Sequence, residues 1–138
     1  MEHHRYMDVP LREICFDFAA GMFDRSTFNT LARNCLRQRM ACDDVQIRCK
    51  CQEVDGLLDR LKGVGWFAEV QGGRQWLHAA MAHNGRLIGL LSCERDAKAP
   101  AWTQAEGVAL LRHATTMSSP IVCPPADMQA LEQEGIRA

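Results

Sequence analysis

The chain has 138 residues, of which 47% are hydrophobic and 24% are charged, and its 16 basic and 17 acidic residues give a net charge of −1. This length suits a single domain, and the apolar content is that of a globular protein rather than a disordered one. Because no stretch is rich in lysine or arginine, a nucleic-acid-binding surface is not expected. No apolar run approaches the roughly 20 residues of a membrane-spanning helix, so we expect no membrane association.

The amino-terminal sequence MEHHRYMDVP contains histidines and an arginine but lacks the apolar core of a signal peptide, which predicts a cytoplasmic protein. The chain also has seven cysteines, many for its length. Because this number is odd and no export signal precedes them, we expect reduced thiols rather than a disulfide framework. Most of these thiols should be buried and act as small apolar side chains.

Two helices are predicted in the first forty residues. Apolar side chains recur at helical spacing from Leu11 to Met22, and Pro10 suits the first turn of this helix. The second helix should run to Met40, with Ser26 as its N-cap.

Residues 44–52 alternate between small or apolar side chains and polar ones, which predicts a half-buried strand near the edge of a sheet. Cys49 and Cys51 would share one face of this strand. A short helix over residues 54–61, a strand over residues 66–70 and a turn over residues 71–74 should follow.

The clearest local pattern is the sequence QWLHAAMAHNGRLIGLLSCERD, which predicts a β-hairpin. Asn84 and Gly85 separate two apolar stretches, and both residues tolerate the positive φ of a type I′ turn. A two-residue turn gives the following opposed pairs: Ala80 and Gly89, His78 and Leu91, and Trp76 and Cys93. Because both faces of the hairpin are mainly apolar, we expect two central strands that are covered on both sides.

A capping box of Thr103 and Glu106 predicts the start of a long amphipathic helix that should end near Ser118. A short polar helix is expected over residues 126–134. The predicted fold is therefore α+β, with a central antiparallel β-sheet flanked by N-terminal and C-terminal helices. One domain should span residues 1–124, with a tail or short helix over residues 125–138.

Two kinds of site are candidates. The small residues Ala80 and Gly89 open space in the hairpin, which either a packed helix or a ligand would fill. The ligand alternative places the following residues around a pocket: Trp66, Trp76, His78, Leu91 and Cys93. A redox alternative uses the thiols of Cys49, Cys51 and Cys93. The sequence has no paired C-x-x-C elements and no phosphate-binding glycine loop, so we predict no metal and no cofactor, and any ligand is an unidentified small molecule.

The segments NGRLIGLLSCERD and AWTQAEGVALLRHATTMSSPI resemble the C-terminal half of a GAF domain, mainly over residues 76–120. In that family a strand of the form G-x-x-I/V-G-x-L leads through a loop ending in an aromatic residue to Ser/Thr-x-x-Glu/Asp and a long helix. The resemblance implies the sensory fold that GAF domains share with PAS-like and profilin-like proteins. It also implies a non-catalytic sensory or regulatory domain that binds a small ligand or a partner protein, and a homodimer formed through the first and last helices. The alternative functions are a cysteine-based redox enzyme or sensor, and a protein-interaction adaptor or inhibitor.

Overall fold

The computed structural model describes residues 8–124, which form an α+β fold with a central antiparallel sheet, as predicted. The expected helix over residues 126–134 lies outside the described residues. In chain order the elements are α2 (Leu11–Ala19), α3 (Arg25–Met40), β1 (Asp44–Cys49), α4 (Asp55–Leu61), β2 (Trp66–Gln71), β3 (Arg74–His83), β4 (Arg86–Asp96) and α5 (Gln104–Met117). The strand order is β1-β4-β3-β2, with every neighbouring pair antiparallel.

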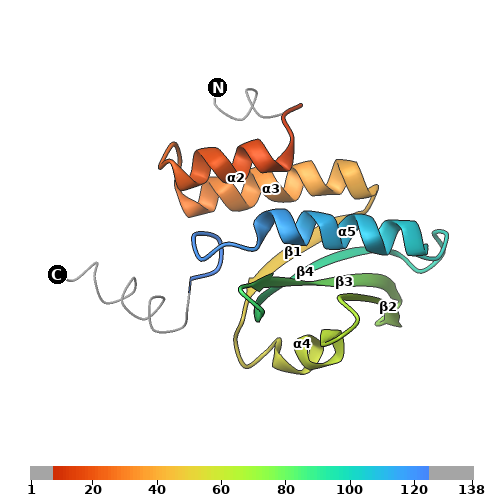
Figure 1. The fold of residues 1–138 in the computed structure, drawn as a ribbon. Coiled ribbons are helices and arrows are strands. Elements are labelled where there is room, and N and C mark those ends of the chain that lie inside the picture. The colour runs from red at the N-terminus through yellow and green to blue at the C-terminus, as the bar shows by residue number, and fades with distance from the viewer. Residues whose placement is uncertain (1–7, 125–138) are drawn as a thin grey trace.

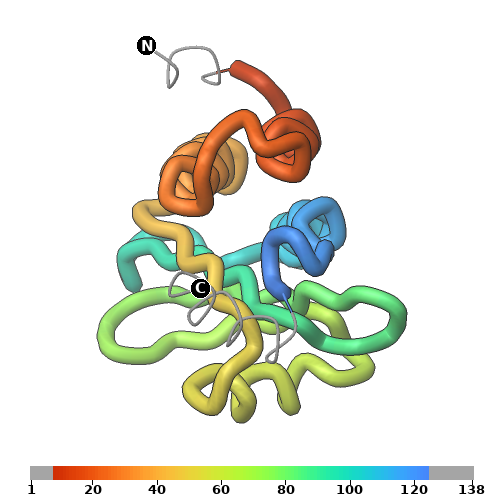
Figure 2. Tube along the Cα trace, turned by 90° about the vertical axis from the view of Figure 1, so that its left-hand side faces the viewer, coloured from red at the N-terminus to blue at the C-terminus, as the bar shows by residue number. Residues whose placement is uncertain are grey.

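The helices lie on both sides of the sheet (Figure 1, Figure 2). α3 and α5 pack over one face, and α2 lies against both of them on the outside. α4 lies alone across the opposite face. Among the helices of residues 8–124, none combines the length and the apolar character that a bilayer crossing requires.

Two apolar cores hold these layers together. The larger core lies between the sheet and the helices α2, α3 and α5, and its fully buried side chains include Ile14, Phe28 and Leu110. The smaller core lies under α4 and joins Leu58 of that helix to Leu90 of β4. The prediction that β3 and β4 are the central strands, and that the strand over residues 44–52 lies at an edge, is confirmed.

The ends of the helices show where local sequence rules hold. The predicted capping box is present at α5, where the Glu106 N–H donates to Thr103 Oγ1 at 3.1 Å and the Thr103 N–H donates to Glu106 Oε1 at 2.9 Å. At α3 the predicted N-cap was wrong. Asp24, not Ser26, accepts from the Thr27 N–H at 2.8 Å, because both residue types cap well and the helix begins earlier, at Arg25.

The β3–β4 hairpin has the predicted turn but not the predicted register. Asn84 and Gly85 both have positive φ, 52° and 78°, as the type I′ turn requires. Beyond the first two pairs, however, a β-bulge leaves Ile88 without a partner on β3, so that Ala82 pairs with Leu87 and Met81 with Gly89. The expected pairing of Ala80 with Gly89 was therefore wrong by one residue.

This one-residue shift also changes the pairs further along the hairpin. His78 pairs with Ser92 and Trp76 with Glu94, where Leu91 and Cys93 were predicted. Because alternate residues of a strand point to opposite faces, Leu91 and Cys93 lie on the face opposite His78 and not on its own face, where the predicted register would have placed them.

Gly107 allows α5 to approach the sheet closely. A Cβ atom at this position would overlap the indole ring of Trp66 on β2. The Gly107→Ala substitution should therefore lower the free energy of unfolding by about 1–3 kcal/mol, because overpacking outweighs the better helix propensity of alanine. Chemical denaturation with urea measures this change.

Gly56 in α4 is the matched control, because a Cβ atom there would meet nothing within 4 Å. The Gly56→Ala substitution should raise the free energy of unfolding by up to about 1 kcal/mol, as expected from helix propensity alone. If both alanine variants were stabilised, the close contact between α5 and Trp66 would be contradicted.

Candidate functional site

The structure places the five predicted pocket residues on two different faces of the sheet. Leu91, Cys93 and Trp66 belong to the large core beneath α3 and α5. His78 and Trp76 lie on the α4 face, with their rings stacked at a centroid distance of 5.8 Å and an angle of 6°. These residues therefore do not meet around a single hollow.

A network of hydrogen bonds surrounds His78 on the α4 face. The imidazole is only 2% exposed, with Nε2 2.8 Å from Glu69 Oε2 and Nδ1 2.7 Å from Ser92 Oγ. An ionised carboxylate can only accept, so Nε2 carries the proton and donates to Glu69. In the neutral ring Nδ1 is then the acceptor, and it takes the hydrogen of the Ser92 hydroxyl.

The charges of this network follow from burial and from its hydrogen bonds. Burial lowers the pKa of His78, and the opposing hydrogen bond with Glu69 does not reverse this direction. Burial raises the pKa of Glu69, but the hydrogen bonds from His78 and from Arg60, at 3.2 Å, outweigh it and leave that pKa below its usual value. At neutral pH the network therefore contains a neutral imidazole beside an ionised carboxylate.

Ser92, His78 and Glu69 are the residue types of a hydrolytic triad, but their placement does not suit nucleophilic catalysis. Ser92 is 0% exposed in a central strand, and Arg48 Nη2 donates to its oxygen at 3.3 Å. The ring of Phe67 covers the imidazole at a centroid distance of 5.0 Å. A nucleophile must reach its substrate, so this network stabilises the sheet rather than performing acyl transfer.

From the lowered pKa of His78 we expect the folded protein to be less stable in acid. Because the pKa of His78 is lower in the folded chain than in the unfolded chain, where it is about 6.5, the unfolded state binds more protons below this pH. The free energy of unfolding should therefore fall as the pH drops below about 6.5. In the His78→Gln variant this fall should be smaller, as measured by urea denaturation at a series of pH values.

Ser92→Ala is the control for the His78 variant, because it removes the hydrogen bonds of Ser92 with His78 and with Arg48 and keeps the buried imidazole. It should lower stability by about 1–2 kcal/mol while retaining the wild-type pH dependence. An identical pH dependence in the wild type and in His78→Gln would show that His78 is not the titrating group.

The cysteines form pairs that spacing along the chain did not predict. The thiols of Cys42 and Cys93 are in hydrogen-bond contact, and so are those of Cys49 and Cys123. The hydrogen bond from Cys93 lowers the pKa of Cys42, whereas the same hydrogen bond and burial raise the pKa of Cys93. The hydrogen bond to Cys49 and burial likewise raise the pKa of Cys123.

The redox residues expected from the sequence are separated in the structure. β1 ends at Cys49, so Cys51 does not share its face as predicted, but lies exposed in the following turn. Cys93 is fully buried on the face opposite His78. Sequence reasoning missed the partners Cys42 and Cys123, for which the unusual number of cysteines was the only signal.

A cleft of about 1120 Å³ opens on the α4 side, beside the β3–β4 turn. Its walls come from α4, from the loop after β1, from the turn itself and from the segment after α5. The charged and histidine side chains that line it are Lys50, Asp55, Asp59, Lys62, His83 and Arg86. Leu58, Leu87, Ile88 and Pro120 add apolar surface. None of the predicted pocket residues lines this cleft, and of the redox residues only Cys51 does.

Within residues 8–124, no group of three or more His, Cys, Asp and Glu side chains is placed to hold a metal ion. Comparison with known proteins finds no matching family model and no curated protein with a matching sequence.

Proposed function

We propose that the protein is a non-catalytic regulatory domain of GAF-like architecture that binds a small anionic molecule in the cleft beside the β3–β4 turn. The observation that carries this proposal is the cleft itself, whose volume of about 1120 Å³ is close to the range typical of small-molecule sites. It joins apolar surface to a few charged groups, which is the usual composition of such sites.

The charges around the cleft favour an anion. Lys62 Nζ already pairs with Asp59 Oδ1 at 3.1 Å, so these two charges balance each other. Lys50 and Arg86, by contrast, form no ion pair with another residue in 8–124, and Asp55 is the remaining carboxylate of the lining.

A carboxylate or phosphate group would pair with Lys50 and Arg86, while an apolar part of the ligand would contact Leu87 and Ile88.

The arrangement of the sheet supports the regulatory assignment. α3 and α5 pack over one face, whereas the seven-residue α4 packs mainly against β3 and β4 on the other, and the cleft lies at its margin. The buried position of Ser92 argues against a hydrolytic role for the group of Ser92, His78 and Glu69. Binding, rather than catalysis, is therefore the role that best suits this chain.

A thermal-shift screen with phosphate, citrate and adenosine monophosphate tests ligand binding. At least one of these anions should raise the melting temperature of the wild type, because binding to the native state stabilises it. In the Lys50→Ala and Arg86→Ala variants the affinity for that anion should fall about tenfold, which corresponds to losing one charge-assisted hydrogen bond worth about 1.5 kcal/mol. Isothermal titration calorimetry measures the change in affinity.

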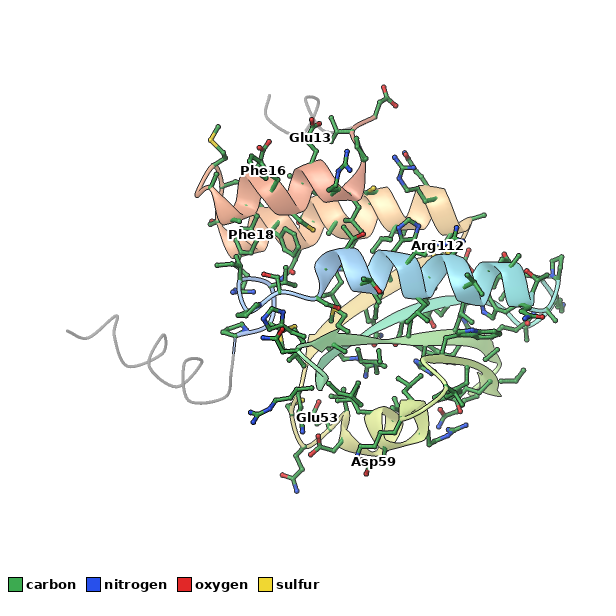
Figure 3. All side chains as sticks on the ribbon, in the orientation of Figure 1. Glu13, Phe16, Phe18, Glu53, Asp59 and Arg112 are labelled. Carbon is green, nitrogen blue, oxygen red and sulfur yellow. The ribbon has the colours of Figure 1, made fainter. Side chains whose placement is uncertain are left out.

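Arg112→Ala is the matched control, because Arg112 is exposed on α5, on the opposite side of the sheet from α4 (Figure 3). This variant should bind the anion as tightly as the wild type does. Equal losses of affinity in all three variants would indicate general charge attraction, and the absence of any stabilising anion would remove support for the cleft as a binding site.

We also propose that two copies of the chain associate through α2 and α5, as the family resemblance implies. Phe16 of α2 is 72% exposed and Met22, just beyond α2, is 54% exposed, and α2 packs beside α5 (Figure 3). Phe16→Glu should shift the protein from dimer to monomer in sedimentation velocity, because a charge in an apolar interface is costly. Val64→Glu, at a position that is 59% exposed after α4, should leave the dimer unchanged. A monomeric wild type would contradict this proposal.

A further inference from the structure

We propose that Cys49 and Cys123 form an intramolecular disulfide when the protein meets a peroxide, and that this bond ties the segment after α5 to the edge strand β1. The inference concerns a covalent bond within the chain, so it stands independently of any ligand in the cleft.

The two sulfur atoms already lie together. The thiols of Cys49 and Cys123 are in hydrogen-bond contact, and Cys49 Sγ also donates to the carbonyl oxygen of Val122 at 3.5 Å. The residues are far apart in sequence, so tertiary structure alone creates this contact. Cys49 is the last residue of β1, and Cys123 lies beyond the end of α5.

The cross-strand partner of Cys49 is a glycine, which makes room for the second sulfur. Cys49 pairs with Gly89 on β4, and a Cβ atom at Gly89 would lie 2.9 Å from Cys123 Sγ. That distance is shorter than van der Waals contact, so any side chain at this position would displace the thiol. The absence of a side chain at Gly89 therefore allows Cys123 to reach β1.

Other bonds hold the segment after α5 in place in the reduced protein. Arg25 of α3 donates to the carbonyl oxygens of Val122 at 2.6 Å and of Ile121 at 2.9 Å. The Cys123 N–H donates to the Ser119 carbonyl oxygen at 2.9 Å. These hydrogen bonds hold the segment that carries Cys123 beside the end of β1 before any oxidation takes place.

Exposure assigns different roles to the two sulfurs. Cys49 is partly exposed, whereas Cys123 is 1% exposed, so a small peroxide reaches Cys49 first. The Cys49 thiolate attacks one peroxide oxygen, the O–O bond breaks, and Cys49 sulfenic acid and hydroxide form. The Cys123 sulfur then attacks Cys49 Sγ and displaces hydroxide, while its proton goes to water. In total, two thiols and one hydrogen peroxide give one disulfide and two water molecules.

The bond would change the wall of the cleft. Cys123 and Pro124 line it on one side, and Lys50 and Cys51, which directly follow Cys49, line it on another. A disulfide between Cys49 and Cys123 would join these two walls covalently. Oxidation would thus limit how far this side of the cleft can open.

The test treats the folded protein with hydrogen peroxide, blocks the remaining thiols with iodoacetamide, and maps disulfides by tryptic digestion and mass spectrometry. Trypsin cleaves after Lys50, so peptides containing Cys49 and Cys51 are separated. We expect a cross-link between the peptides of Cys49 and Cys123 that dithiothreitol reverses. It should persist in Cys51→Ser and disappear in Cys49→Ser and in Cys123→Ser.

Thermal unfolding provides a second measurement that does not depend on peptide recovery. Peroxide should raise the melting temperature of the Cys51→Ser protein, because the cross-link restricts the unfolded chain, and it should not raise that of a Cys51→Ser/Cys123→Ser protein. The proposal is overturned if peroxide raises the melting temperature of the Cys51→Ser/Cys123→Ser protein as much as that of the Cys51→Ser protein. It is equally overturned if Cys49 and Cys123 both remain open to alkylation in the unfolded, peroxide-treated wild type.

Discussion

The β-bulge at Ile88 is the constraint on which most of the molecule depends. One extra residue in β4 shifts every pair between Met81 and the far end of the hairpin by one position. Because side chains alternate between faces, this shift places His78 opposite Ser92 and points the side chain of Cys93 toward the large core. It also places Gly89 opposite both Met81 and Cys49, where its missing side chain leaves space for a sulfur atom.

The short helix α4 explains why one face of the sheet carries a polar network. With seven residues, this helix covers Ala80 and Leu90 but does not extend over the next row of the sheet. The side chains in that row must therefore satisfy one another, and the Glu69–His78–Ser92 chain of hydrogen bonds does so. Burial lowers the pKa of His78 in this network, and this links the stability of the sheet to pH.

On the face of the sheet beneath α3 and α5, close contacts hold the helices against the strands. Gly107 lets α5 approach Trp66, and Arg33 of α3 donates to the Val45 carbonyl oxygen at 2.9 Å and to Asp44 at 2.7 Å. These contacts hold the helical layer against both edges of the sheet. The segment after α5 is consequently positioned over the end of β1, where it completes one wall of the cleft and brings Cys123 to Cys49.

The elements themselves could be predicted from the sequence, because their causes are local. The period of apolar residues, the capping box of Thr103 and Glu106, and the positive φ of Asn84 and Gly85 act within a few residues of each other. The α+β class and the central position of β3 and β4 followed from these features. The edge position of β1 followed from its alternating pattern.

Only the tertiary structure decided the register of the hairpin, the faces of the candidate residues and the pairing of the cysteines. The apolar pattern of the sequence does not reveal the bulge at Ile88, because the residues on both sides of it are small or apolar and would suit either register. The contact between Cys49 and Cys123 depends on β1, β4 and the end of α5 meeting in space, and no spacing along the chain encodes it. The physical reason is that side-chain proximity across a sheet is set by packing between distant segments, whereas local sequence determines only the conformation of each segment.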